Sequence, residues 1–135
     1  MNKEKVIIDA TNSPLGRLAS FSAKQALFGK SIVIVNCDSA IISGRKSSII
    51  NEYKEARARG GAILKGPNFP KNPERIIKRT IRGMLPYKNG RGRDALKRVI
   101  CYNKVPKEYE NAEKISLQKI FNIKTMTLKE LSERI

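Results

Sequence analysis

Two β-branched runs flank a helical pattern in VIIDATNSPLGRLASFSAKQALFGKSIVIVNC, residues 6–37 of the chain. The runs at 6–8 and 32–35 are short, continuous and apolar, which is typical of parallel strands buried on both faces. Strand, helix and strand with short joints predict a βαβ unit, the basic element of a mostly parallel sheet.

The helix between the two runs is marked at both ends. Ser13 is expected to be its N-cap and Pro14 its first residue, where a missing N–H costs nothing. Gly29 is expected to end it, since glycine readily adopts the left-handed conformation found after helices. One face carries small and apolar residues at helical spacing, namely Leu15, Leu18, Ala19, Ser22 and Ala26.

The rest of the chain predicts further short elements. A third strand is expected at 40–42 and the last strand of the sheet at 99–102, with a turn-rich connection over 83–93. Helices are expected at 47–59, from 73, at 94–98, near 117–121, and from 127, where Thr127 and Glu130 form a capping box.

These elements together predict a single α/β domain. A small, mostly parallel β-sheet with helices packed on it, built around the βαβ core, is expected over residues 1–104. A C-terminal helical appendage of the same domain is expected over residues 105–135.

The composition limits the class of protein. The chain has 135 residues, 40% of them hydrophobic, which is too apolar for a disordered polycation. No apolar run approaches the roughly 18 residues that a membrane helix needs, and no signal peptide precedes Asp9. We therefore expect a cytosolic protein with no membrane partner.

The charge is large and unevenly distributed. Lys and Arg number 28 against 12 Asp and Glu, a formal net charge of +16. Residues 54–104 hold fifteen basic and three acidic side chains, a net +12, whereas residues 1–53 carry +3 and residues 105–135 carry +1. A surplus concentrated in one segment of a folded chain indicates a binding face for a polyanion, most often a nucleic acid.

One predicted helix carries much of this charge. Arg75, Lys78, Arg79 and Arg82 fall at i, i+3, i+4 and i+7, opposite an apolar face formed by Ile76, Ile77, Ile81 and Met84. A solvent-exposed helix usually mixes the signs of its charges, but only Glu74 is acidic here. The pattern favours contact with phosphates.

The segment that follows, PYKNGRGR at 86–93, combines arginines with glycines. Glycines let a backbone approach a sugar–phosphate chain closely. One guanidinium group can donate two parallel hydrogen bonds to a phosphate. We expect phosphate contacts here and at Lys97 and Arg98. Tyr87 either stacks on an unpaired base or packs on the preceding helix, and the extended segment 65–71 either threads between nucleic-acid helices or forms a surface loop.

Arg45 and Lys46 follow the predicted strand at 40–42. The order SGRK at 43–46 partly resembles a phosphate-binding loop, but the spacing of a P-loop is not present. We therefore reject a nucleotide site and expect both side chains to contact phosphates.

Catalytic and metal-binding groups are scarce. Asp9 and Asp38 each end a predicted strand, so they could hold Mg²⁺ for a nuclease or phosphotransferase, but capping of the neighbouring loops is favoured. The chain has no His, and Cys37 and Cys101 lack the spacing of a zinc site. Two reduced, half-buried thiols are expected.

Three motifs resemble those of the universal large-subunit ribosomal protein L-thirteen family, in its archaeal and eukaryotic branch. In chain order they are IDA at 8–10 with SPLGRLA at 13–19, NCD at 36–38 with SGRK at 43–46, and IRGMLP at 81–86 with Gly92, Arg93 and Leu96. The resemblance implies a parallel α/β fold, no enzymatic activity and a structural place in the large ribosomal subunit. It also implies binding to large-subunit rRNA and, in the bacterial branch of the family, a part in early subunit assembly.

We therefore expect a structural constituent of the large ribosomal subunit, located on the cytoplasmic ribosome, that binds large-subunit rRNA, contacts neighbouring ribosomal proteins and supports assembly. No cofactor, metal ion or small-molecule substrate is expected. The alternatives are a Mg-dependent nuclease or phosphotransferase using Asp9 and Asp38, and an mRNA-binding regulator acting off the ribosome. The expected RNA contacts are Arg45, Lys46, Arg75, Lys78, Arg79, Arg82, Lys88, Arg91, Arg93, Lys97 and Arg98.

Overall fold

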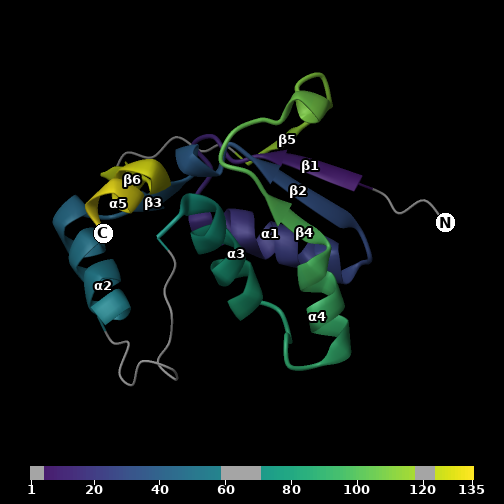
Figure 1. Cartoon of the computed structure of the whole chain (residues 1–135), viewed down its shortest axis with the longest axis horizontal. Coiled ribbons are helices and arrows are strands. Elements are labelled where there is room, and N and C mark those ends of the chain that lie inside the picture. Colours follow the sequence, from purple (N-terminus) through teal and green to yellow (C-terminus); the bar gives the residue numbers. More distant parts are fainter. Residues whose placement is uncertain (1–4, 59–70, 118–123) are drawn as a thin grey trace.

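A four-stranded parallel sheet lies at the centre of the computed structural model, which describes residues 5–58, 71–117 and 124–135 except the side chains of 57 and 58 (Figure 1). Its strand order is β4–β2–β1–β5. The strands are β1 (Lys5–Asp9), β2 (Ser31–Val35), β4 (Val99–Cys101) and β5 (Ile115–Ser116). The predicted α/β class with a mostly parallel sheet is confirmed.

The predicted βαβ unit forms the middle of this sheet. β1 and β2 pair in parallel from Lys5↔Ser31 to Asp9↔Val35, and α1 (Leu15–Leu27) connects them. Gly29 has φ +93° and donates its N–H to the Ala26 carbonyl. The next N–H, of Lys30, bonds to the carbonyl of Gln25, so the helix ends in a Schellman motif. The expected helix end is confirmed.

The start of α1 differs from the prediction. The helix begins at Leu15, Pro14 occupies the cap position, and no side chain caps it. Ser13 is fully buried, and its carbonyl accepts a 3.0 Å hydrogen bond from the Ile41 N–H, while Pro14 forms a bridge to the same residue. Residues 13 and 14 are thus drawn toward the next strand, and the predicted Ser13 cap is wrong.

Two further helices, α3 (Pro73–Gly83) and α4 (Gly90–Lys97), pack against α1 on one face of the sheet (Figure 1). The predicted connection over 83–93 is therefore wrong in its second half, since Gly90 already begins α4. Gly92 is buried, and a Cβ atom there would overlap the Pro86 carbonyl. Glycine is needed at this position because α4 packs closely against the Pro86 backbone. Met84, expected inward, is 45% exposed, and Leu85 is buried instead.

A second, two-stranded sheet lies at one end of the molecule (Figure 1). Here β3 (Ile41–Ser43) pairs antiparallel with β6 (Thr125–Thr127). α2 (Lys46–Ala58) follows β3, and α5 (Leu128–Arg134) follows β6. The strand and helix expected at 40–42 and 47–59 are confirmed to within two residues.

The residues after β4 form strands as well as the expected helix. β5 and β6 correspond to no predicted strand, so β4 is not the last strand of the sheet as expected. Most of the helix expected near 117–121 lies outside the described residues, as does segment 65–70 of the extended loop. The final helix is confirmed, with the Thr127 hydroxyl oxygen accepting a 3.2 Å bond from the Glu130 N–H.

The hydrophobic core lies mainly between the sheet and the three helices α1, α3 and α4. Fully buried side chains there include Ile8, Leu18 and Ile77. Met126, Leu128 and Leu131 belong to the same cluster, so α5 and β6 share the core of the preceding residues. The division of the chain at residue 104 stays a prediction.

Short turns complete the structure. They include the 3₁₀ helices η1 (Cys37–Ser39) and η2 (Lys107–Tyr109). η2 places Tyr109 with Val33 and Val35 in a small second cluster. Among the described helices, none is long and apolar enough to cross a membrane.

Candidate nucleic-acid interface

α3 is held on the sheet by its apolar face and by its first turn. Ile76, Ile77 and Ile81 are buried beneath it, as predicted. Pro73 occupies the start of the helix, and the Glu74 N–H donates to the Asn103 side-chain oxygen at 3.1 Å. Asn103 lies just beyond β4, so a residue distant in sequence caps α3 and fixes its direction.

The four basic side chains of α3 that are predicted to contact phosphates have different environments. Arg75 and Arg82 are exposed, whereas Lys78 and Arg79 are half-buried. The Lys78 ammonium donates to the Val99 carbonyl at 2.9 Å, which ties α3 to β4. Arg79 lines a cavity of about 290 Å³ between α2 and α3, together with Tyr53 and Glu52. The outermost cations of this helix are therefore Arg75 and Arg82.

Tyr87 packs on the preceding helix, one of its two expected roles. The Arg82 guanidinium lies over its ring, 4.3 Å from the ring centroid, and the tyrosine is half-buried. Such a cation–π contact orients the arginine without neutralising its charge. Arg82 is thereby directed outward with its positive charge intact.

α4 presents further cations to solvent. Lys88 precedes the helix, and Arg91, Arg93 and Lys97 lie on it; all four are exposed. Arg98, at the helix end, is half-buried and donates from Nη2 to the Ala26 carbonyl at 2.8 Å. Its buried Nε has no hydrogen-bond partner among the described residues. Arg98 therefore anchors α4 to the C-terminal end of α1.

Six exposed cations on and between these two helices form what we call the α3–α4 surface. Within the described residues, none of the six side chains is paired with a carboxylate, and the guanidinium of Arg82 over the Tyr87 ring is their one side-chain interaction. Unpaired positive charges repel one another and favour binding of a polyanion. The residues of this surface are Arg75, Arg82, Lys88, Arg91, Arg93 and Lys97.

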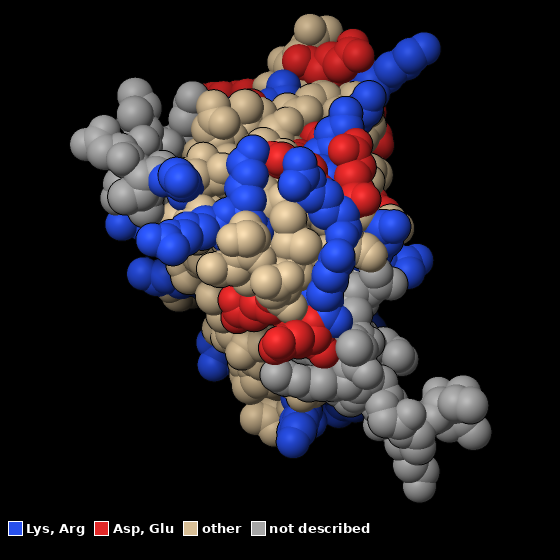
Figure 2. All heavy atoms as spheres, turned by 90° about the vertical axis from the view of Figure 1, so that its left-hand side faces the viewer, with Lys and Arg blue, Asp and Glu red and all other residues tan. Residues whose placement is uncertain are grey.

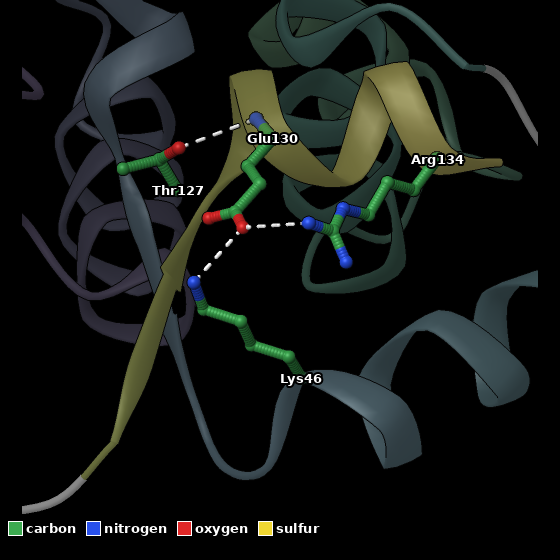
Figure 3. Close-up of polar contacts among 4 residues, drawn as sticks. All are labelled: Lys46, Thr127, Glu130 and Arg134. Atoms are coloured by element: carbon green, nitrogen blue, oxygen red, sulfur yellow. Dashed lines mark hydrogen bonds and ion pairs between the residues drawn. The ribbon is translucent and has the colours of Figure 1, made fainter.

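Arg45 and Lys46 lie elsewhere, where β3 leads into α2 at the other end of the molecule from α4 (Figure 1). The Lys46 ammonium forms a 2.9 Å ion pair with Glu130 of α5, whose carboxylate also lies 3.6 Å from the Arg134 guanidinium (Figure 3). Arg45 is exposed. Figure 2 shows that basic side chains cross the upper half of this end, with acidic ones among and below them.

Lys124 is a basic residue that the prediction missed. Antiparallel pairing of β3 with β6 sets Ser43 opposite Thr125, and the Gly44 N–H donates to the Lys124 carbonyl at 2.9 Å. Lys124 thus lines the same cleft as Arg45 and Lys46. No local sequence pattern signals this neighbour, because the pairing joins distant segments.

Asp9 caps its own loop. Its carboxylate accepts hydrogen bonds from the Thr11 N–H and hydroxyl and from the Asn36 side-chain amide, at 2.7 to 3.1 Å. Burial acts to raise the pKa of Asp9, but these bonds and the charge of Lys114 hold it below its usual value. Asp38 accepts from Ser39 at 3.4 Å. No three potential ligands gather into a metal site within the described part of the chain.

The two cysteines are neighbours in space. β2 pairs with β4 so that Ile34 lies opposite Cys101, and the Cys37 thiol reaches the Ile34 carbonyl at 3.6 Å. Both thiols are free, Cys37 buried and Cys101 half-buried. A hydrogen bond with Cys101, together with burial, raises the pKa of Cys37 well above its usual value. Its thiol is therefore protonated and unreactive at neutral pH.

Comparisons with known proteins point to one family. The family model described as "Ribosomal protein L13" matches residues 3–108. The "Large ribosomal subunit protein uL13" of Methanosarcina barkeri is 53% identical over 112 residues, covering 82% of this chain and 79% of that protein. The protein of the same name from Methanocaldococcus jannaschii is 46% identical over 132 residues, covering 96% of each chain.

Proposed function

The chain belongs to the ribosomal protein L13 family of the large ribosomal subunit, and from this premise we propose that it binds large-subunit rRNA through the α3–α4 surface. Supporting the assembly of the subunit is part of the same proposal, since a protein that neutralises phosphates stabilises compact RNA. Its place of action is the ribosome in the cytoplasm, beside neighbouring large-subunit proteins.

The unpaired state of the six α3–α4 cations carries the proposal. Each basic side chain that neutralises a phosphate releases condensed counterions, which makes binding favourable and steeply dependent on salt. The short α4 and the tightly packed Gly92 keep three of these cations on a rigid element. Recognition would follow the shape of the folded RNA and its unpaired regions, because the deep groove of an A-form helix hides its bases.

The remaining predicted contacts divide by environment. Arg45 and Lys46 contact phosphates at the other end of the molecule. Lys78 and Arg98 act by positioning α3 and α4, since their hydrogen bonds to backbone carbonyls link each helix to a neighbouring element. Arg79 contacts RNA from the edge of the cavity between α2 and α3.

The alternative functions receive less support. A Mg-dependent nuclease would need the Asp9 carboxylate for a metal ion, but three hydrogen bonds already converge on its Oδ1 and use it to order the loop. We therefore propose a protein without enzymatic activity. A regulator of messenger RNA would use the same cations, so only its location distinguishes it from a ribosomal constituent.

Co-sedimentation of the tagged, full-length protein tests the proposal. We expect it to travel with large ribosomal particles at one copy per particle through washes of moderate salt. Recovery mainly in the free pool or on messenger RNA would contradict the ribosomal function. Turnover of labelled RNA with Mg²⁺ that Asp9→Asn abolishes would establish the enzyme instead.

A further inference from the structure

A basic cleft lies where β3 leads into α2, apart from the α3–α4 surface. Its volume is about 510 Å³, within the range of roughly 300 to 1,000 Å³ that ligand sites occupy. Gly44, with φ +132°, makes the turn from β3 into α2, and its N–H bond to the Lys124 carbonyl closes one side. The residues that line the cleft are Arg45, Lys46, Ser47, Lys124 and Thr125.

The charges around this cleft are arranged to leave a positive surplus. Among the described residues, three cations line it and no carboxylate does. The Glu130 carboxylate lies 2.9 Å from the Lys46 ammonium and 3.6 Å from the Arg134 guanidinium, so two cations share this one carboxylate (Figure 3). Lys46 lowers the pKa of Glu130, so this carboxylate stays ionised at neutral pH and restrains the lysine.

The side-chain cations of Arg45 and Lys124 have no partner among the described residues. The lining hydroxyl groups of Ser47 and Thr125 can each donate one further hydrogen bond. Two unpaired cations, one restrained ammonium and two hydroxyl groups suit the closely spaced, anionic oxygens of a phosphate chain. A neutral or apolar ligand would leave these donors unsatisfied.

The cleft and the α3–α4 surface belong to different parts of the fold. The surface lies on helices that pack against the central sheet, and the cleft is built from the separate β3–β6 sheet and the start of α2. Figure 1 shows α2, β3 and β6 at one end of the molecule and α4 at the other. A single RNA segment on the surface therefore leaves the cleft open to a second one.

We propose that this cleft is a second phosphate-binding site, through which one chain joins two RNA segments. The proposal rests on the RNA binding proposed above, including the phosphate contacts of Arg45 and Lys46, and adds Lys124, the cleft that the three cations share and the bridging. Joining two segments raises the effective concentration of each for the other, which favours folding of a large RNA.

Binding of labelled RNA hairpins to the full-length protein tests this inference. Donor-labelled and acceptor-labelled copies of one short hairpin are mixed in excess over the protein. We expect two hairpins per protein and energy transfer between them. The cleft variant, with Arg45, Lys46 and Lys124 all replaced by Gln, is expected to bind one hairpin and to lose the transfer.

A matched control removes three charges elsewhere. Lys24, Lys104 and Lys107 are exposed and lie outside both sites, so their joint replacement by Gln should leave two hairpins and the transfer intact. Circular dichroism and thermal unfolding confirm that each variant is folded. A cleft variant that still binds two hairpins, or a wild-type protein that binds only one, would overturn the inference.

Two competitors identify the ligand. Tripolyphosphate is expected to displace the second hairpin with at least tenfold greater potency than inorganic phosphate, as a site for a phosphate chain requires. Stronger displacement by poly-glutamate would assign the cleft to an acidic protein and overturn the inference. Loss of the first hairpin in an Arg75, Arg91 and Arg93 variant tests the RNA-binding function separately, since the cleft is intact there.

Discussion

The two basic regions of this protein are assembled in different ways. The α3–α4 surface draws its six cations from one stretch of chain, residues 75–97, which contains α3, α4 and the connection between them. The cleft draws Arg45 and Lys46 from the start of α2 and Lys124 from the segment leading into β6. A local surface is encoded by helical spacing, whereas the cleft exists only when two distant strands pair.

This difference also explains which cations keep their charge free. On the α3–α4 surface the six cations have no carboxylate partner in the described structure, whereas Lys46 of the cleft is paired with Glu130 beside it. We therefore expect the first region to bind RNA strongly and with a steep salt dependence. We expect the second region, where Lys46 is already paired, to bind more weakly. Substitutions that affect one region and spare the other separate these roles.

Gly92→Ala should have the largest effect, because it attacks the packing of the α3–α4 region. A Cβ atom would overlap the Pro86 carbonyl, so α4 must shift or unfold. We expect a loss of about 3 kcal/mol of stability in urea unfolding, together with weakened RNA binding at the α3–α4 surface. The matched control Gly90→Ala, at an open position, should change stability little. Equal stability of the two variants would contradict the close contact between Gly92 and the Pro86 carbonyl.

Asp9→Ala should have an intermediate effect at the joint between the two regions. Asp9 orders the loop that leads to Ser13, which in turn bonds to Ile41 of β3. Leaving the Thr11 and Asn36 donors without a partner should cost about 2 kcal/mol at pH 7.

The effect of Asp9→Ala should depend on pH. Because the folded-state pKa of Asp9 is lowered, its ionised form stabilises the fold above its unfolded pKa, near 3.8. That stabilisation is lost as the pH falls through the folded pKa. Urea unfolding from pH 7 to pH 2.5 should therefore show the difference between wild type and variant narrowing. A constant difference would show that the charge of Asp9 is not what stabilises the loop.

Glu130→Gln should have the smallest effect, confined to the cleft end. It removes the ion pairs with Lys46 and Arg134 but keeps the backbone bond from residue 130 to Thr127. We expect a fall of about 1–2 °C in Tm that disappears at high salt. Because the folded pKa of Glu130 is lowered, the stabilisation is present above pH 4.5 and lost on acidification. A difference that persists in high salt would contradict an exposed ion pair.

Much of the fold could be predicted because its signals are local. The β-branched runs of β1 and β2, the helical stripe of α1 and Gly29 each specify their own conformation. Where tertiary pairing competes, such prediction fails. Ser13 has the right chemistry for an N-cap, yet its carbonyl accepts from the Ile41 N–H of the next strand. Gly92 makes a close contact within a helix, where a turn-rich connection was expected.

The candidate interface shows the same limit. Helical spacing alone grouped the four basic residues of α3, namely Arg75, Lys78, Arg79 and Arg82. It could not reveal that the Lys78 ammonium donates to the Val99 carbonyl of β4. Likewise Arg98 is basic in sequence and an internal anchor in structure. Lys124 was missed because only the β3–β6 pairing brings it to Arg45 and Lys46.

The salt dependence of binding to large-subunit rRNA tests the role of the α3–α4 surface most directly. The wild type is compared with an Arg75, Arg91 and Arg93 to Gln variant and with the Lys24, Lys104 and Lys107 to Gln control. We expect the slope of log K against log salt to fall in magnitude by about 2 to 3 for the arginine variant and to stay unchanged for the control. Equal slopes for the two variants would contradict the assignment of this surface to RNA.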